Sequence, residues 1–442
     1  MPGRRVRFHE YDVDFARREL RKSGVRVGLQ HKPFRVLELL LRRPGELVTR
    51  EELVALLWPD SHVSFERGLN TAVNSLRHVL GESSRDCRFI ETRPGIGYRF
   101  CAPVEEVTEG DSSTVPPHAT DKGADAYQDY LKGRYFLDRM CEEEVYKAIA
   151  FFRSAAAEET CRSLAQAGIA DAYCQLALLG SAPVSQLVGP ARMSAELALN
   201  NDPDLPEAVV AAGRVKMIFD WDWTGAREAG SRAVALDTSS VTAQAFQASL
   251  LCTLSNYEEA QQLCRRALAL DPLSFPANVQ FAACLYGARD FESAANQCWK
   301  ILTLAPRFAP AQILLALAYE RLGMYEEALV EFQNARSCVG FKAVATSGMG
   351  QVFGVTGLDM EAERMFVELS KQAESGYVSP YRYAVVCAGR RQEAQALSFL
   401  EESLRQRDPA LLSLNADARL DALRGHEEFQ TVLRRLGTNG HS

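Results

Sequence analysis

The sequence predicts a multidomain chain in which a small α+β module precedes an all-α array of helical hairpins. In residues 70–100 an amphipathic helix ends at Gly81 and is followed by two strand-like runs, Arg88–Thr92 and Tyr98–Cys101. The later half of the chain repeats with a period of 34 residues. The two parts of the chain also differ in charge. Residues 1–105 hold 19 Lys+Arg and 14 Asp+Glu, a net charge of +5, whereas the remainder has a net charge of −12. We therefore expect a basic domain joined to an acidic one.

The basic domain shows strand-like runs first and helical patterns after them. Pro44 and Gly45 end the first helix, and Thr49 and Glu52 form a capping-box pattern that opens the second. A third helix is expected over residues 64–80. The expected strands are Val6–Tyr11, Val13–Arg17, Glu19–Arg21 and Val25–Leu29, and the first two helices are Pro33–Leu41 and a helix through Leu57.

Small, aromatic and proline residues share the 34-residue period of the later half. This pattern resembles the tetratricopeptide repeat, in which small residues let two helices approach closely and Pro ends the second helix. We expect about seven helical hairpins, with irregular ones at the ends and an insertion at Gly376–Pro380 that shifts the last repeat. The periodic positions are Ala226, Ala260, Ala294, Ala328 and Ala362; Trp223, Tyr257, Phe291 and Tyr325; and Pro272 and Pro306.

These patterns predict three segments. Residues 1–104 form the basic domain, residues 105–125 a polar linker with Pro116 and Pro117, and residues 126–442 the helical repeats.

One side of the third helix is apolar and the other is polar when residues 64–80 are placed at about 100° per residue. The polar side has amides, a hydroxyl and guanidiniums, the groups that read base edges or hold phosphates. A solvated helix face is usually rich in Glu and Lys, and this one has only Glu66, at the first turn. The polar residues are Arg67, Asn70, Thr71, Asn74, Arg77 and His78, with Ser75 at the edge.

Residues 5–104 resemble the DNA-binding domain of the OmpR/PhoB winged-helix family. The resemblance covers the strand-rich opening, the segments 29–37, 44–53, 57–58 and 76–80, and the hairpin 89–100. It implies a four-stranded N-terminal sheet, three helices and a C-terminal hairpin wing. The third helix would enter the major groove of double-stranded DNA, and the wing would meet the adjacent minor groove.

The resemblance also implies which residues make contacts. Family contacts of the helix fall on Arg67, Thr71, Asn74, Ser75 and Arg77. The wing contributes Thr92, Arg93 and Tyr98. The loop between the second and third helices would contact RNA polymerase, and its residues are Trp58, Pro59, Asp60, Ser61 and His62.

The wing departs from the family in one respect. The family often has Arg just before Gly95, where this chain has Pro94, and Arg93 lies one residue earlier. A one-residue change in a strand reverses the side-chain direction. The alternative interpretation is therefore a protein-interaction scaffold whose winged-helix domain no longer binds DNA.

The repeats leave several roles open. Stacked helical hairpins form a concave surface suited to peptides or protein partners. They could sense a partner, pair two copies so that the winged domains bind tandem sites as a homodimer, or tether another protein. An acidic repeat body could also fold back over the basic domain and inhibit it. Partner sensing coupled to self-association is the preferred interpretation.

Other function classes are not indicated. No apolar run approaches the ~20 residues of a membrane span, and the N-terminus lacks a signal-peptide pattern, so we expect a cytoplasmic protein. Seven His lack metal-ligand spacing, and eleven Cys without a C-x-x-C pair are expected to be reduced core thiols. The glycine-rich run Gly348–Gly354 has the wrong spacing for a phosphate loop, and close helix packing is the better interpretation. We expect no cofactor, no metal and no enzymatic activity.

Overall fold

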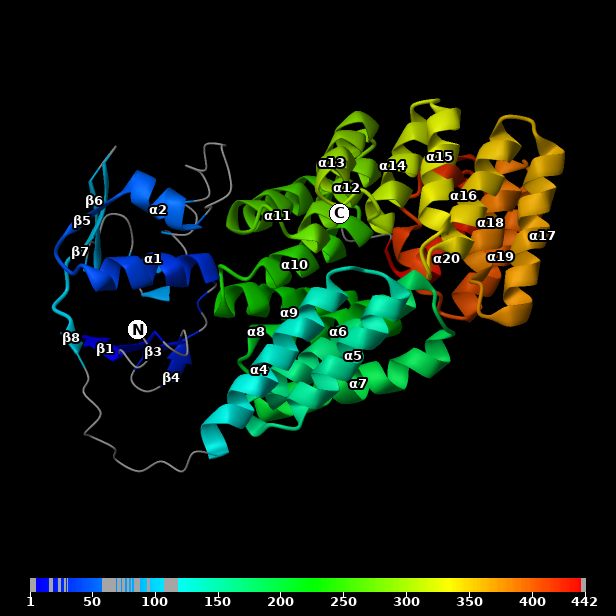
Figure 1. Ribbon diagram of the computed structural model, residues 1–442. Helices are drawn as coiled ribbons and strands as arrows, with labels where there is room; N and C mark the ends of the chain where they lie inside the picture. Colours follow the sequence, from blue (N-terminus) through cyan, green and yellow to red (C-terminus); the bar gives the residue numbers. More distant parts are fainter. Residues whose placement is uncertain are drawn as a thin grey trace. The chain divides into compact units, whose positions relative to one another are not determined.

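The computed structural model describes residues 5–15, 19–22, 25–27, 29, 31–57, 69, 73, 76–77, 79–80, 82, 88–93, 96–106 and 118–438 (Figure 1). The chain divides into two compact units, residues 1–116 and 117–442. Two of the described elements overlap the segment expected to be a linker. Strand β8 occupies Glu105–Glu106, and helix α4 begins at His118.

The N-terminal unit contains two antiparallel sheets and the helices α1 (His31–Arg42) and α2 (Arg50–Leu57). The first sheet has the order β4-β3-β2-β1-β8, and the second has the order β5-β7-β6. β8 is thus a fifth strand of a sheet expected to have four. The other strands are β1 (Arg5–Phe8), β2 (Tyr11–Asp14), β3 (Glu19–Lys22), β4 (Val25–Val27), β5 (Leu47–Thr49), β6 (Ile90–Arg93) and β7 (Gly97–Phe100).

Local sequence signals explain most of these elements. The Thr49 N–H donates to Glu52 Oε2 at 2.9 Å and the Glu52 N–H donates to Thr49 Oγ1 at 3.2 Å, so the predicted capping box opens α2. The turn between the first two strands was misplaced. It lies at His9 and Glu10 rather than at Asp12, because His9 adopts a left-handed conformation with φ of 49°.

The second unit is a stack of paired helices (Figure 1), and the described part contains eight consecutive pairs where about seven were expected. The helices are α4 (His118–Leu137), α5 (Glu142–Ala156), α6 (Arg162–Leu179), α7 (Val184–Asn201), α8 (Pro206–Val215), α9 (Trp223–Leu236), α10 (Val241–Thr253), α11 (Tyr257–Leu270), α12 (Phe275–Gly287), α13 (Phe291–Leu304), α14 (Ala309–Arg321), α15 (Tyr325–Arg336), α16 (Lys342–Val355), α17 (Asp359–Ser375), α18 (Pro380–Gly389) and α19 (Glu393–Arg405).

Short helical segments complete the second unit. One turn of π-helix, η2 (Lys216–Asp220), continues α8, and the 3-10 turn η1 (Glu159–Cys161) precedes α6. The 3-10 turns η3 (Pro409–Ser413) and η4 (Ala418–Leu423) and the helix α20 (Glu427–Leu436) follow the last pair.

The period of 34 recurs in the backbone as well as in the sequence. The five periodic alanines are all fully buried, which confirms that they lie where helices meet. A left-handed residue recurs at the same step in the turns of the last six hairpins, at Trp221, Ser255, Arg289, Gly323, Gly357 and Arg391. The expected shift of the last repeat is therefore wrong. The period from Gly357 to Arg391 is unchanged because a longer α17 precedes a shorter α18.

One pair of cysteines departs from the expectation of reduced thiols. Cys252 on α10 and Cys284 on α12 are joined in a disulfide. They are 32 residues apart, close to one period, so they fall at neighbouring positions on successive first helices of the hairpins. Among the described residues, no helix is long and apolar enough to cross a bilayer.

Candidate nucleic-acid interface

The apolar side of the third helix packs into the N-terminal core, as predicted. Leu69, Val73 and Leu76 are helical and at most 1% exposed, and Leu80 at the end of the segment is 2% exposed. They share one buried cluster with strands β1 and β2 and helix α1. Because this side faces inward, the opposite side of the helix is the one that a ligand could reach.

Arg77 is the polar residue of this helix that the structure describes, and it does not reach solvent. Its side chain is buried, and Nη2 donates to the Ile90 carbonyl at 2.8 Å and to Thr92 Oγ1 at 2.6 Å. Its Nε lies 3.7 Å from Glu82 Oε1. The placement of Arg77 on an outward face was therefore wrong, because its long side chain turns inward to satisfy polar groups of strand β6.

Glu82 completes this contact between the helix and the hairpin. Its carboxylate accepts hydrogen bonds from the Phe89 N–H at 2.6 Å and from the Ile90 N–H at 3.0 Å. Burial raises the pKa of Glu82 above its ordinary value, although these N–H groups and Arg77 favour the ionised form. We call Arg77, Glu82, Ile90 and Thr92 the helix–wing network. Sequence analysis did not identify Glu82, because an acid after a helix-ending glycine gives no sign of burial.

Strands β6 and β7 form the predicted hairpin, with Thr92 opposite Tyr98 and Arg93 opposite Gly97. At its tip, the Ile96 side chain is 54% exposed. The Ile96 N–H donates to the Arg93 carbonyl at 3.0 Å, and the Ile96 carbonyl accepts from the Arg50 N–H at 3.0 Å. The tip is thus held against the first residue of α2.

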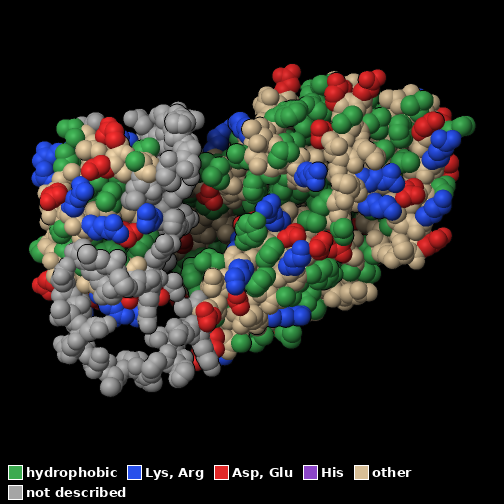
Figure 2. All heavy atoms as spheres, in the orientation of Figure 1, with side chains coloured by type: hydrophobic (Ala, Val, Ile, Leu, Met, Phe, Trp, Pro, Cys, Tyr) green, Lys and Arg blue, Asp and Glu red, His purple; other side chains and the backbone are tan. Residues whose placement is uncertain are grey.

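Three predicted wing residues differ in accessibility. Arg93 is exposed and pairs with Glu91, with Nε 3.0 Å from Oε1. Thr92 is half-buried and accepts from Arg77. Tyr98 is buried, and its hydroxyl accepts from Arg50 Nη1 at 3.0 Å. Its inclusion among contact residues was wrong, because a ring packed into the core cannot meet a nucleotide. Figure 2 shows Lys and Arg side chains on the visible face of this unit.

The remaining predicted contacts lie outside the described residues. They are the helix residues Arg67, Asn70, Thr71, Asn74, Ser75 and His78 and the loop residues Trp58, Pro59, Asp60, Ser61 and His62.

Residues 409–438, which we call the C-terminal segment, pack back against the helical repeats. Its buried side chains, including Leu420 and Phe429, join the cluster formed by α5, α6 and α8. The Trp223 indole N–H on α9 donates to the Leu436 carbonyl at 2.9 Å. The C-terminal segment is therefore part of the packed core of the repeats.

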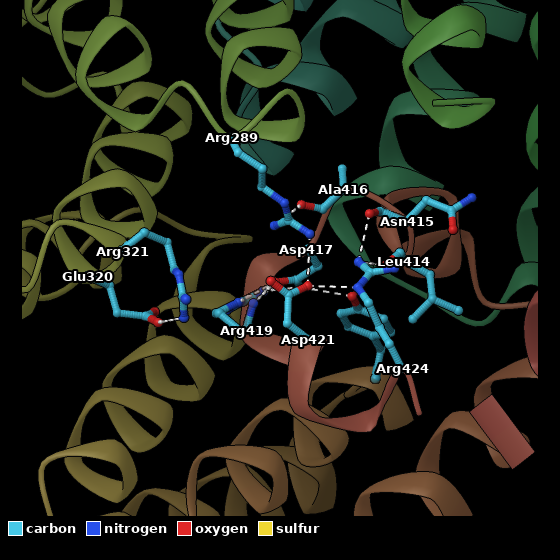
Figure 3. A network of polar contacts seen from close by, with 11 residues as sticks. Arg289, Glu320, Arg321, Leu414, Asn415, Ala416, Asp417, Arg419, Asp421 and Arg424 are labelled. Carbon is cyan, nitrogen blue, oxygen red and sulfur yellow. Dashed lines mark hydrogen bonds and ion pairs between the residues drawn. The ribbon is translucent and has the colours of Figure 1, made fainter. Parts of the chain in front are cut away.

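Polar contacts fix the C-terminal segment to several repeats (Figure 3). Arg289, in the turn after α12, donates to Asp421 at 2.8 Å and to the Ala416 carbonyl at 3.2 Å. Asp417 accepts from Arg419 at 2.7 Å and from the Tyr381 hydroxyl of α18 at 2.8 Å. Burial opposes the charge on Asp417, but the adjacent Arg419 outweighs it and lowers the pKa of Asp417.

The glycine-rich run lies within helix α16, as expected for a packing role. A Cβ on Gly348 would lie 2.3 Å from the Phe332 ring, and one on Gly354 would lie 2.6 Å from the Gly389 carbonyl carbon. Glycine is needed there because neighbouring helices approach closely. Within the part of the chain that the structure describes, no three His, Cys, Asp or Glu side chains are grouped to hold a metal ion.

In the first unit, hydrogen bonds thus join a helix to a two-stranded wing. The second unit is a stack of helical hairpins. Together they define the class of protein: a winged-helix domain joined to helical repeats of the tetratricopeptide type. Residues 24–100 match the family described as transcriptional regulatory protein, C terminal. The N-terminal unit therefore belongs to the OmpR/PhoB-type winged-helix DNA-binding domains of transcriptional regulators.

Known proteins resemble the two units separately. The transcriptional regulator HilA of Salmonella typhimurium is 37% identical over 89 residues, which are 20% of this chain and 16% of that protein. The KDP operon transcriptional regulatory protein KdpE of Escherichia coli is 31% identical over 99 residues, 22% of this chain and 44% of that protein. The matches therefore span less than half of these relatives.

Two solved structures are each similar to part of this chain. The DNA-binding domain of Klebsiella pneumoniae RstA, in complex with the RstA box, has a TM-score of 0.21 and 24% identity, and the match covers 22% of this chain and 96% of that one. A tetratricopeptide repeat protein from Parabacteroides merdae has a TM-score of 0.39 and 14% identity. This match covers 57% of this chain and 93% of that one.

Proposed function

We propose that this protein is a sequence-specific DNA-binding regulator of transcription. In this proposal the helix over residues 64–80 enters the major groove and the β6–β7 hairpin lies at the adjacent minor groove. The observation that carries it is the helix–wing network, in which Arg77 and Glu82 tie the helix to strand β6. Two elements fixed to each other can meet adjacent grooves without ordering on binding, which lowers the entropic cost of association.

The proposed contact set follows from this arrangement. Arg67, Asn70, Thr71, Asn74, Ser75 and His78 read bases or hold phosphates from the helix. Arg93 contributes from the wing, where its exposed guanidinium pairs with Glu91. Arg77 and Thr92 position the wing rather than touch DNA. The loop of Trp58 to His62 is proposed to contact RNA polymerase.

The repeats are proposed to recognise a protein or peptide partner and to bring two copies together on tandem sites. Apolar side chains exposed on several repeat helices support this role, among them Trp299 at 50% and Met360 at 67%. Figure 2 shows hydrophobic side chains interspersed with charged ones on the visible face of the repeats. Exposed apolar side chains of this kind are typical of surfaces that bind other proteins.

Selection from a random duplex library with the full chain tests the proposed function. A regulator enriches one motif, and the variant with Arg67→Ala and Asn74→Ala loses that enrichment. Arg5→Ala is the matched control, because Arg5 is also basic and pairs with Asp14 on the first sheet, 2.8 Å away. If no motif is enriched while the protein still captures a partner, the scaffold interpretation is favoured.

A further inference from the structure

Two cysteines far apart in the sequence meet within the repeat unit. Cys141 lies in the turn between α4 and α5, and Cys338 lies in the turn after α15. They are 197 residues apart, and their sulfur atoms are 3.1 Å from each other, with the Cys338 thiol donating to Cys141. A disulfide bond needs about 2.05 Å, so a shift of about 1 Å joins them.

The packing of the two turns holds these sulfurs together. The Cys141 thiol also donates to the Val339 carbonyl at 3.3 Å. Gly340 adopts φ of 91°, and a Cβ at that position would lie 2.9 Å from Glu142 Cβ. Met140 packs against the buried cluster of α12, α13 and α14. The contact therefore involves two packed backbone segments as well as the side chains.

Both sulfurs are accessible to small molecules. They line a cavity of about 600 Å³ together with Tyr135, Arg139, Glu144 and Arg307. By contrast, Cys161, Cys174, Cys298 and Cys387 are buried thiols. Burial and the neighbouring Cys141 raise the pKa of Cys338 above its ordinary value, so Cys338 retains its proton.

We propose that Cys141 and Cys338 are a reversible oxidation site that responds to hydrogen peroxide. The Cys141 sulfur attacks a peroxide oxygen and becomes a sulfenic acid, the O–O bond breaks, and the other peroxide oxygen leaves as water with the Cys141 thiol proton. The Cys338 sulfur then attacks the Cys141 sulfur, and the S–O bond breaks. Water leaves with the thiol proton, so two thiols are oxidised to one disulfide and the peroxide is reduced to two waters. A dithiol reductant reverses the reaction.

The bond would fasten the first hairpin of the repeats to the sixth. In a stack of repeats each hairpin mainly contacts its neighbours, so distant repeats move with little direct coupling. A covalent link between α4–α5 and α14–α15 restricts the unit from opening along its length. Oxidation would thus reduce the conformational freedom of the unit that we propose to bind a partner, although the reaction itself does not depend on that function.

The test uses the full chain with Cys101→Ser, because Cys101 is exposed and would otherwise link two chains. The chain is treated with hydrogen peroxide, digested without reduction and analysed by mass spectrometry. We expect a linked peptide pair containing Cys141 and Cys338, the loss of two hydrogens from the intact chain, and reversal by dithiothreitol. The melting temperature of the repeat unit should rise by several degrees on oxidation.

Matched variants separate this site from general thiol oxidation. Cys141→Ser and Cys338→Ser should each abolish the linked peptide and the rise in melting temperature, whereas Cys161→Ser should leave both unchanged. A Cys141 oxidised to sulfinic acid with no link to Cys338 would overturn the proposal. Cross-links from Cys141 or Cys338 only to other cysteines would overturn it as well.

Discussion

Arg77 Nη2 lies 2.6 Å from Thr92 Oγ1 and 2.8 Å from the Ile90 carbonyl, so one guanidinium joins the third helix to the first wing strand. Arg77 is buried and Thr92 is half-buried, so these hydrogen bonds are largely shielded from water. In a domain of this family the two elements it joins are those that meet DNA. This relationship fits the proposed role of Arg77, which is to position the wing.

Replacing Arg77 should destabilise the N-terminal unit. Arg77→Met keeps most of the side-chain volume but leaves the Ile90 carbonyl and the Glu82 carboxylate without this partner. We expect a cost of about 3 kcal/mol in the free energy of unfolding. Differential scanning calorimetry of the full chain measures it as a lower melting temperature for the N-terminal transition only.

The control for this variant is Arg42→Met. Arg42 is 55% exposed and donates to Glu38 at 2.7 Å, so its loss should cost less than about 1 kcal/mol. Equal effects of the two variants would show that burial of Arg77 does not matter for stability.

Gly97 tests the attachment of the wing. A Cβ at Gly97 would lie 2.0 Å from the Val48 carbonyl oxygen and 2.9 Å from Thr49 Cα. Gly97→Ala should therefore separate β7 from β5 and speed amide hydrogen exchange in residues 97–100. Gly45→Ala is the comparison: no atom would contact the new Cβ, and the cost there comes only from φ of 81°. Unchanged exchange in the Gly97 variant would contradict the close approach.

Sequence patterns predicted those features that depend on residues close together in the chain or on a fixed period. The capping box needs only Thr49 and Glu52, and the buried Ala260 and Ala294 follow from a repeat of 34. Contacts between distant segments have no such signal. Nothing periodic joins Cys141 to Cys338, and a helical wheel cannot show that a long Arg77 side chain turns back toward strand β6.

Buried charge in the C-terminal segment gives a matched pair of substitutions. The Asp417 side chain is 4% exposed and pairs with Arg419. The Asp421 side chain is 41% exposed and pairs with Arg289. Asp417→Asn leaves a buried guanidinium without its counter-charge and should lower the unfolding free energy of the repeats by about 3 kcal/mol. Asp421→Asn should lower it by less than about 1 kcal/mol. Urea unfolding followed by circular dichroism measures both, and a reversed order would contradict the structure.

Glu320 should make the repeat unit more stable at lower pH. Burial raises the pKa of Glu320 to about 7, despite the neighbouring Arg419, and its ordinary value is 4.5. Because the folded state binds the proton more tightly than the unfolded state, this contribution is fully present below pH 4.5 and is lost as the pH rises toward 7.

Glu320→Gln should remove this dependence. At pH 8 the variant should be more stable than the wild type by up to about 3 kcal/mol, and the difference should shrink toward pH 5. Glu401→Gln, at an exposed position, should leave the free energy of unfolding unchanged at both pH 8 and pH 5. A Glu320→Gln difference that grows as the pH falls would show that the carboxylate, not the acid, stabilises the fold.

DNA binding by the full chain as a function of salt tests the central claim most directly. On a duplex with the selected motif, the account predicts an affinity that exceeds that for a scrambled duplex and falls with salt. Log K should decrease by about 0.9 per phosphate contact for each tenfold rise in salt. Arg67→Ala with Asn74→Ala should bring the motif down to the scrambled level, and Arg5→Ala should not. Equal binding to motif and scrambled DNA at every salt concentration would contradict sequence-specific regulation.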